Sequence, residues 1–273
     1  MVDLRGFQEY LILGERSELT VEKYLRDVEH FFRWMGSGEL SKSKMLAYKE
    51  ELLEGYAVSS VNSMLSSVNC YLTYLGHPEY RVKVVKQQRS PFLPVEKELS
   101  KAEYTRLLQV AEQKPRLHLL MQTICTTGIR VSEHRFITVE AAKAGYAEVR
   151  LKGKQRMVFL PKKLCALLLK YAKEREIRSG SIFITATGKP MNRCNIWAEM
   201  KKLCTTARVS REKVFPHNLR HLFARIYYGM ERDIVRLADI LGHSSINTTR
   251  IYTMESGHTH RKQIDRMELL LIT

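Results

Sequence analysis

Apolar residues recur every three or four positions through the first quarter of the chain, and this spacing predicts amphipathic helices. In residues 17–35 one such stripe consists of Val21, Tyr24, Leu25, Val28, Phe31 and Phe32. Comparable patterns run through residues 41–55 and 59–76, and a shorter one occupies residues 3–14. The pattern therefore predicts a set of four helices over residues 1–76.

The helical pattern stops between residues 77 and 98. This stretch contains three prolines and a cluster of basic residues but no apolar stripe, which predicts a linker. Helical spacing resumes after Ser100, where Glu103 three residues later completes a capping-box sequence. We therefore expect a second domain over residues 99–273, with a last helix at about 256–273.

A different period appears in residues 146–161, where apolar and polar residues alternate on both sides of a turn centred on a glycine. This alternation predicts a β-hairpin. The chain from residue 161 onward is mostly helical in pattern. The expected fold class is mainly α with a small antiparallel β-sheet (α+β), in two domains.

Composition limits the class of protein. The chain has 273 residues, of which 44% are hydrophobic, as in globular proteins. Its longest apolar runs are too short to span a membrane, and the N-terminal residues lack a secretory-signal pattern, so we expect no membrane partner. Five cysteines without a C-x-x-C pair favour reduced thiols in a cytoplasmic protein over disulfides or a zinc site.

Charge changes the picture most. The formal net charge is +16, and residues 99–273 carry 32 Lys and Arg against 15 Asp and Glu. A basic field of this size attracts polyanions, of which nucleic acid is the usual one. Residues 1–80 carry only 8 basic against 12 acidic residues, so few basic side chains are available there to meet DNA. The expected DNA contacts are Lys42, Lys44 and Lys49, then Arg81, Lys83, Lys86 and Arg89, and finally Lys154 and Arg156 of the hairpin.

Chemistry-bearing side chains gather in three stretches and the hairpin turn. The stretches read TTGIRVSEHRF, FPHNLRHLFARIYYG and LGHSSINTTRIYT. They supply Arg130, His217, Arg220, His221, His243 and Tyr252, and the hairpin turn supplies Lys152.

Such a set of side chains could act on a phosphodiester. Two guanidinium groups can hold the non-bridging oxygens of one phosphate and stabilise the negative charge of its transition state. A tyrosine hydroxyl, with a pKa near ~10, can attack if a histidine accepts its proton, and a lysine can protonate the departing 5′ oxygen. No cluster of acidic residues suggests Mg²⁺. The residues predict phosphoryl transfer on DNA through a phosphotyrosine, without metal or other cofactor.

Each of these residues also has a simpler interpretation. Arg130 and His217 could cap helices, and His221 could pack against its neighbours. Tyr252 could be a core aromatic residue, and Lys152 could be one of several phosphate contacts. Spacing alone does not bring the stretches together in space.

Taken together, the stretches resemble motifs of the tyrosine recombinases, the integrase and Xer-like site-specific recombinases. TTGIRVSE is similar to the first-arginine motif of that family, HNLRH matches its H-x-L-R-H motif, and LGHSSINTTRIYT is similar to L-G-H-x-x-x-x-T-T-x-x-Y. KGKQRMVFLP resembles the family's K-G-x-K-x-R-x-V-P-L hairpin, one residue shorter. The resemblance covers nearly the whole chain, with the motifs in the family's order.

The resemblance implies a role for each matched residue. Arg130 and Arg220 would be the two catalytic arginines, His217 the general base or an orienting group, and His243 a donor to the scissile phosphate. Tyr252 would be the nucleophile that forms a 3′-phosphotyrosine and frees a 5′-hydroxyl. Lys152 would be the general acid, with Lys154 as its competitor in the shortened hairpin. Glu133 and His221 would support the site.

Three positions depart from the family pattern. His134 and Arg135 stand where the family has leucine and another apolar or small residue, and Phe159 stands where it has proline. The departures at His134 and Arg135 and the shortened hairpin favour a mobile-element enzyme over a housekeeping Xer protein.

The resemblance also implies an architecture and partners. Residues 1–76 would be a helical, SAM-like core-binding domain and residues 99–273 a catalytic domain, together clamping duplex DNA. Four protomers would recombine two duplexes through a Holliday junction, with the C-terminal helix docking on a neighbour and DNA-bending proteins as possible accessories. The expected location is the bacterial cytoplasm, at the nucleoid.

The expected function is thus site-specific recombination by an integrase or transposase. Three alternatives stay open: a Xer-like resolvase of chromosome or plasmid dimers, a type IB topoisomerase, and a DNA-binding protein without catalysis.

Overall fold

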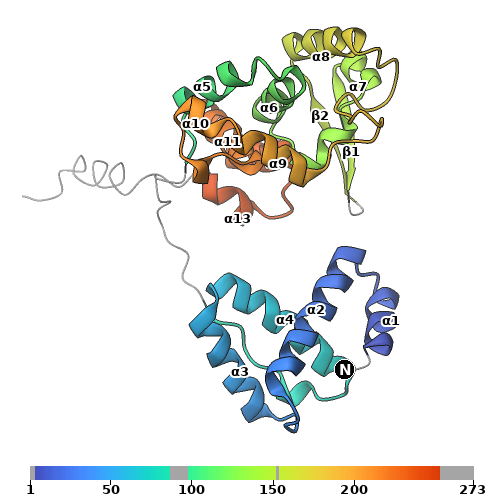
Figure 1. Cartoon of the computed structure of the whole chain (residues 1–273), viewed down its shortest axis with the longest axis vertical. Coiled ribbons are helices and arrows are strands. Elements are labelled where there is room, and N and C mark those ends of the chain that lie inside the picture. The colour runs from blue at the N-terminus through green and yellow to red at the C-terminus, as the bar shows by residue number, and fades with distance from the viewer. Residues whose placement is uncertain (1–3, 87–97, 152–153, 253–273) are drawn as a thin grey trace, which may run out of the picture. The chain divides into compact units, whose positions relative to one another are not determined.

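The computed structural model describes residues 4–86, 98–151 and 154–252. The chain divides into two compact units, Met1–Arg89 and Ser90–Thr273, here called the N-terminal and C-terminal units. The two-domain, mainly helical fold with a small antiparallel sheet is confirmed (Figure 1). The helix predicted at 256–273 lies outside the described residues.

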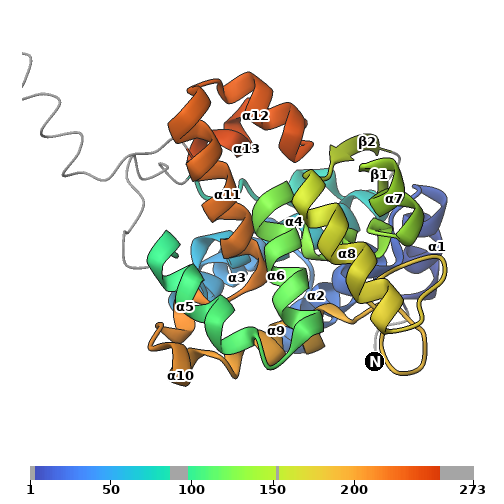
Figure 2. The ribbon, with the colours of Figure 1, turned by 90° about the horizontal axis from the view of Figure 1, so that it is seen from above.

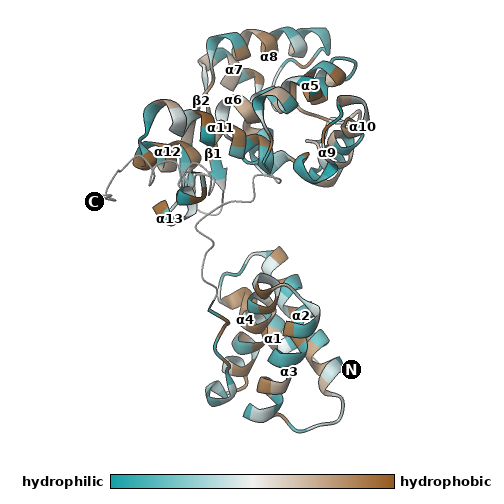
Figure 3. Cartoon of the chain, turned by 90° about the vertical axis from the view of Figure 1, so that its left-hand side faces the viewer, coloured by the Kyte–Doolittle hydropathy of each residue, from teal (hydrophilic) through white to brown (hydrophobic). Residues whose placement is uncertain are grey.

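The described residues of the N-terminal unit form the helices α1 (Arg5–Leu13), α2 (Glu18–Met35), α3 (Lys42–Gly55) and α4 (Val58–Tyr74). The apolar stripe predicted for residues 17–35 turns inward, since Val21, Val28 and Phe31 are buried. Phe31 joins the core of α3 and α4, in which Tyr48 and Leu65 are fully buried. Figure 3 shows hydrophobic positions interleaved with hydrophilic ones along these helices, as expected when each helix buries one face.

The chain after α4 stays attached to the N-terminal unit. The 3-10 helix η1 (Pro78–Tyr80) is followed by an extended segment, residues 81–86. The Asn69 amide bonds both backbone groups of Val82 at 2.8 and 3.0 Å, and Asn62 does the same for Val85 at 2.9 and 2.8 Å. The first part of the range predicted as a linker is therefore fixed to α4. The side chains of Asn62 and Asn69 bond its backbone groups, as a neighbouring strand would in a sheet.

The far end of the predicted linker is also held. Arg225 pairs with Glu98 and donates to the carbonyl oxygen of Leu99. Leu99 is buried in the C-terminal unit. The capping box predicted at Ser100 and Glu103 follows directly and begins α5.

The C-terminal unit contains one β-hairpin among helices. Its elements in order are α5 (Lys101–Ala111), α6 (Pro115–Thr127), η3 (Val131–Phe136), α7 (Val139–Ala144), β1 (Tyr146–Leu151), β2 (Lys154–Phe159), α8 (Lys162–Glu174), α9 (Arg193–Lys201), α10 (Cys204–Ala207), η4 (Arg211–Lys213), α11 (Pro216–Glu231), α12 (Ile234–Leu241), α13 (Ile246–Thr249) and η5 (Arg250–Tyr252). No helix in the described part of the chain is long and apolar enough to cross a membrane.

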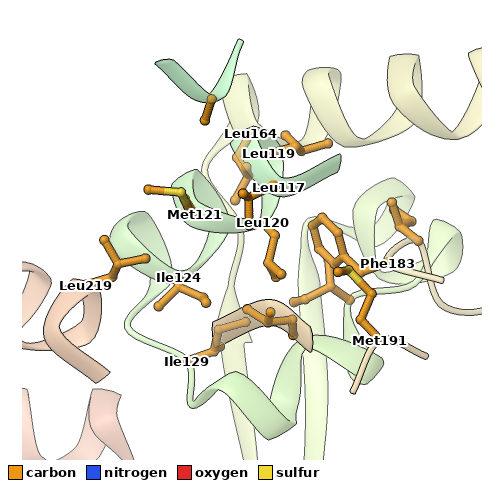
Figure 4. Packing of buried hydrophobic residues seen from close by; sticks show 14 of the residues in the cluster. Leu117, Leu119, Leu120, Met121, Ile124, Ile129, Leu164, Phe183, Met191 and Leu219 are labelled. Carbon is orange, nitrogen blue, oxygen red and sulfur yellow. The ribbon is translucent and has the colours of Figure 1, made fainter. Parts of the chain in front are cut away.

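Helix α6 is the centre of this unit. Leu117, Leu120, Met121 and Ile124 are buried along it, and Figure 4 shows Phe183, Met191 and Leu219 gathered around them. Figure 2 shows α11 beside α6, and the two helices are in contact. The close packing places the end of α6 and the start of α11 next to each other, and these are the two places where the first two motifs lie.

The hairpin register decides which of its side chains face inward. Ala147 pairs with Val158, and Val149 pairs with Arg156, on the face that packs against the core. On the opposite face Tyr146 pairs with Phe159, whose side chain is 75% exposed. Phe159, at a position where the resembling family has proline, therefore faces away from the core.

Candidate active site

A glycine turn delivers the first arginine. Helix α6 ends at Gly128, whose φ of 64° is left-handed, and its N–H bonds Ile124. The chain then extends through Ile129 to Arg130, which begins η3. A Cβ at position 128 would lie 2.5 Å from Cδ1 of Phe223 on α11. Position 128 therefore requires glycine for its backbone angle and for the close approach of α11.

We expect Gly128→Ala to lower the free energy of unfolding by about 3 kcal/mol, combining left-handed strain with overpacking. Gly145→Ala is the matched control, since Gly145 has a φ of 82° but nothing within 4 Å of an added methyl group. That control should lose only about 1 kcal/mol. Urea unfolding of both variants measures the difference, and equal losses would show that the contact with Phe223 is unimportant.

Glu133 fixes Arg130. The Glu133 carboxylate accepts the Arg130 backbone N–H at 2.7 Å and the Arg130 Nη1 at 3.0 Å. Arg130 Nη2 donates to the carbonyl oxygen of Gly242 at 3.2 Å. The Glu133 side chain is 1% exposed, whereas that of Arg130 is 41% exposed. A buried carboxylate thus holds a guanidinium that still reaches solvent.

The second arginine is buried in the second turn of α11. Arg220 donates to the carbonyl oxygens of Gly128 at 2.5 Å and Leu241 at 2.8 Å. Its residue is 1% exposed, and burial, with repulsion from Arg130, lowers its pKa to about 10. Arg220 remains charged at neutral pH, so two guanidinium groups converge on the turn at 241–242.

His243 connects Arg220 to the last motif. Because a guanidinium only donates, Nε2 of His243 accepts from Arg220 at 2.9 Å, and Nδ1 donates to Thr249 Oγ1 at 2.8 Å. Burial and the neighbouring Arg220 lower the pKa of His243 to about 4. The imidazole is therefore neutral at pH 7.

Tyr252 is both a core residue and a neighbour of these cations. It is 4% exposed and packs with Ala224, Leu237 and Leu241. Its side chain also lies close enough to Arg220 to favour the charged form of that guanidinium. The His243 ring stacks on the Tyr252 ring at 5.9 Å with an interplanar angle of 16°. Both interpretations of this tyrosine, core aromatic and reactive group, are compatible with this position.

Two further histidines adjoin the tyrosine. His221 meets the Tyr252 ring edge-on at 4.7 Å, and His217 meets His221 at 4.4 Å. Burial, then repulsion from His217, lowers the pKa of His221 to about 3, and its Nε2 is buried without a hydrogen-bond partner. Burial, then Arg220 and Arg130, lower the pKa of the more exposed His217.

We expect acid to weaken the C-terminal unit through His221. An unfolded histidine has a pKa near ~6.5, so below that pH the unfolded chain binds more protons than the folded one. The free energy of unfolding should therefore fall as the pH drops from 7.5 to 5.5, a window above most carboxylate titrations. Urea midpoints measure this, and His221→Phe should show a smaller decrease. An unchanged pH dependence in the variant would contradict the pKa assigned to His221.

Among the hairpin residues expected to act on DNA, Arg156 is the one whose side chain is described. Arg156, predicted to contact DNA, has a side chain only 13% exposed and donates to Glu133 at 2.6 Å. It therefore points into the site. Lys152 lies outside the described residues, and of Lys154 only the backbone, paired with Leu151, is described.

The departures from the family pattern have packing consequences. His134 is buried, bonds the Val131 carbonyl and lies 6.3 Å from the Phe183 ring. Arg135 is exposed and covers the Phe136 ring at 4.9 Å. Among the described residues, no hydrogen bond or ion pair is seen between either residue and Arg130, Arg156 or Arg220.

Among the DNA contacts predicted in the N-terminal unit, two are engaged by the backbone. Lys42 donates to the Arg81 carbonyl, and Lys49 donates to the Lys83 carbonyl at 2.9 Å. Lys44 lies 6.0 Å from the Trp34 ring. Arg81, Lys83 and Lys86 are exposed, and Arg89 lies outside the described residues.

Sequence reasoning missed a basic groove on the N-terminal unit, here called the α2 groove. Its lining includes Lys23, Arg26, His30 and Arg33 of α2 together with Tyr56, Ser60 and Ser63. The four α2 residues are spaced by three, four and three, so they share one helix face. A period-3.6 search for basic residues could have found them.

Two other residues near the histidines were also missed. Arg193, the first residue of α9, is close enough to lower the pKa of His217. Thr249 is fully buried and orients His243. Within the described residues, no group of three or more His, Cys, Asp or Glu side chains is arranged to hold a metal ion.

Comparison with known proteins agrees with this site. Residues 97–258 match the Phage integrase family, and residues 4–77 match the "Phage integrase, N-terminal SAM-like domain". The Pyrococcus furiosus "Tyrosine recombinase XerA" is 27% identical over 98% of this chain and 94% of its own length. The Vibrio cholerae "Tyrosine recombinase XerD" is 28% identical over 87% of this chain and 86% of its own.

Solved structures share the fold. A XerH site-specific recombinase bound to difH substrate aligns with a TM-score of 0.72 at 20% identity, over 94% of this chain and 81% of that one. A lambda integrase dimer bound to a COC′ core site aligns with a TM-score of 0.74 at 17% identity, over 93% and 95%. The chain belongs to the phage integrase family of tyrosine recombinases, which cleave and rejoin DNA.

Proposed function

We propose that this chain is a site-specific DNA recombinase that cuts and rejoins strands through a 3′-phosphotyrosine on Tyr252. The observation that carries the proposal is the contact of Arg220 with both His243 and Tyr252, beside Arg130. A phosphate bound by the two arginines would lie within reach of the tyrosine hydroxyl. The relatives named above support the same reaction class.

The proposed cleavage step is an in-line displacement. The Tyr252 oxygen forms a bond to phosphorus while the bond to the 5′ oxygen breaks. The tyrosine proton passes to neutral His217, and Lys152 protonates the departing 5′ oxygen. Arg130 and Arg220 neutralise the non-bridging oxygens, and His243, whose Nε2 accepts from Arg220, orients that guanidinium toward the phosphate. Religation reverses the step with a new 5′-hydroxyl, so the bond energy is conserved without ATP.

The proposed assembly is a tetramer that exchanges strands between two duplexes through a Holliday junction. Neighbours of the same fold support this, since one is described as a lambda integrase tetramer bound to a Holliday junction. Two labelled duplexes carrying the target sites would yield recombinant products in EDTA. Relaxation of supercoiled plasmid at dilutions where the chain is monomeric would instead favour the topoisomerase alternative. Binding without either product would favour a silent DNA-binding protein.

We favour a mobile-element integrase acting on bacterial chromosomal DNA, on the basis of His134, Arg135 and the shortened hairpin. A neighbour described as the Tn1549 transposon integrase, with a TM-score of 0.72, is compatible with that role. Similarity to XerA and XerD supports a second candidate, resolution of chromosome or plasmid dimers. A recombination assay distinguishes the two roles. Joining of the ends of an element would support the integrase, and resolution of directly repeated chromosomal sites would support the dimer resolvase.

The α2 groove is the proposed DNA-facing surface of the N-terminal unit. Asp27 is 4% exposed and accepts from Lys23, so one basic side chain is fixed internally. Arg26 and Arg33 are exposed on the same face, where they can meet phosphates, although Arg26 Nη2 also lies 3.6 Å from Asp27 Oδ1. They are among only eight Lys and Arg in residues 1–80.

We therefore expect Arg26→Ala with Arg33→Ala to make the plot of log affinity against log salt shallower by about two. Filter binding at several salt concentrations measures the slope. The matched control, Lys42→Met with Lys49→Met, should mainly lower stability, because those lysines hold the 81–86 segment. A larger slope change in the control would instead support the initially expected contacts at Lys42 and Lys49.

A further inference from the structure

Two arginines on the β-hairpin have opposite environments. Arg150 lies on the outer face, 69% exposed, and pairs with Glu148 at 2.9 Å. Arg156 pairs in register with Val149 on the inner face, and its side chain is 13% exposed. An arginine whose charge served only to attract DNA would be expected on the outer face, so the inward position of Arg156 needs another explanation.

Three contacts fix the Arg156 side chain. Nη2 donates to Glu133 Oε2 at 2.6 Å, and Nη1 donates to the carbonyl oxygen of Ile240 at 2.9 Å. The aliphatic stem and Nε lie against Gly242, where an added Cβ would come within 2.4 Å of Cδ and 2.6 Å of Nε. Gly242, with a φ of 65°, leaves room for this side chain. The guanidinium thus joins β2 to η3 and to the end of α12.

Glu133 passes this restraint to Arg130. Its Oε2 accepts from Arg156 and from the Arg130 backbone, while Oε1 accepts from Arg130 Nη1. Both oxygens of a carboxylate that is 1% exposed are therefore used. Without Arg156 the buried carboxylate would lose one of its two cationic partners. Its orientation would then depend on Arg130 alone.

We propose that Arg156 is a positioning residue for Arg130: through Glu133 it fixes the guanidinium that binds the scissile phosphate, and it does not contact DNA. This inference rests on the proposed function. It adds a third arginine to the site, one that acts through another residue. It also explains why the Arg156 guanidinium of β2 bonds both Glu133 of the first-arginine motif and Ile240 of α12.

The test compares Arg156→Met and Arg156→Lys with the matched control Arg150→Met. We expect Arg156→Met to slow formation of the Tyr252–DNA complex about 100-fold, since small displacements of a phosphate-binding group have effects of this size. Its DNA affinity and salt slope should equal those of the wild type. Arg156→Lys should recover part of the rate, because it keeps a charge near Glu133. Thermal unfolding of each variant establishes that the compared proteins are folded.

Modified substrates identify the group through which Arg156 acts. A methylphosphonate at the scissile position removes the charge that Arg130 neutralises. It should therefore reduce the difference in the rate of complex formation between Arg156→Met and the wild type. A 5′-bridging phosphorothiolate supplies a leaving group that needs no proton. It should leave the difference in rate between Arg156→Met and the wild type unchanged.

Several results would overturn the inference. A salt slope shallower by about one in Arg156→Met would make Arg156 a phosphate contact. Rescue only by the bridging sulfur would place its action at the leaving group. If Arg156→Met were as active as the control Arg150→Met, Arg156 would have no role in cleavage. Failure of the proposed function is recognised separately, because the wild type would then form no Tyr252-dependent complex on unmodified DNA.

Discussion

Replacing Tyr252 by phenylalanine is expected to reduce covalent protein–DNA complex formation by at least about 10⁴-fold, as when a catalytic nucleophile is removed. The variant lacks the oxygen that would bond to phosphorus. It keeps the ring that packs on Ala224, Leu237 and Leu241, and it loses only the hydroxyl beside Arg220. The fold and DNA affinity should therefore be retained while chemistry is lost.

Denaturing gels with a nicked substrate measure this effect. A nick just 3′ of the cleavage position lets the short 5′-hydroxyl fragment diffuse away, so the complex accumulates. Tyr227→Phe is the matched control, because Tyr227 is partly buried against the same cluster. The control should form the complex at nearly the wild-type rate. A complex of normal yield in Tyr252→Phe would mean that another residue attacks the phosphate.

The second large effect is expected for Arg220→Lys. Arg220 donates to three acceptors, the carbonyl oxygens of Gly128 and Leu241 and His243 Nε2, and it lies beside Tyr252. A single ammonium group cannot replace a planar fork of five donors. We expect cleavage to fall about 10³-fold and the free energy of unfolding to fall by about 3 kcal/mol.

Single-turnover cleavage and urea unfolding measure the two consequences of Arg220→Lys. Arg236→Lys, at an exposed position of α12, is the matched control and should behave like the wild type. Cleavage by Arg220→Lys within a few-fold of the wild type would contradict the role of a bidentate guanidinium at the phosphate.

Local patterns predicted much of the fold. The stripe containing Val21, Val28 and Phe31 is buried as its spacing requires, and the capping box at Ser100 and Glu103 forms. The alternation in residues 146–161 gives the hairpin. These signals were readable because each depends on residues close together in the chain.

Features that depend on residues far apart in the chain could not be predicted from local patterns. Residues 81–86 have no helical stripe, and they are ordered by Asn62 and Asn69 rather than by their own pattern. Lys42 and Lys49 were expected at DNA but donate to that segment. A basic side chain in a sequence does not reveal whether its partner is a phosphate or a backbone carbonyl.

The candidate site divides in the same manner. Spacing within each motif suggested the reactive residues Arg130, Arg220 and Tyr252, but only tertiary contacts bring them together at the turn of residues 241–242. The inward direction of Arg156 depends on hairpin register, which pairs it with Val149. Alternation alone leaves two choices of face, and the burial of Val149 selects one.

The most direct test of the phosphotyrosine is to identify the atom that carries the DNA. The trapped wild-type complex, formed in EDTA, would be digested with nuclease and trypsin and analysed by tandem mass spectrometry. We expect a nucleotide linked through its 3′ phosphate to Tyr252, in the peptide that begins at Ile251. A nucleotide on any other residue, or one linked through its 5′ phosphate, would contradict it.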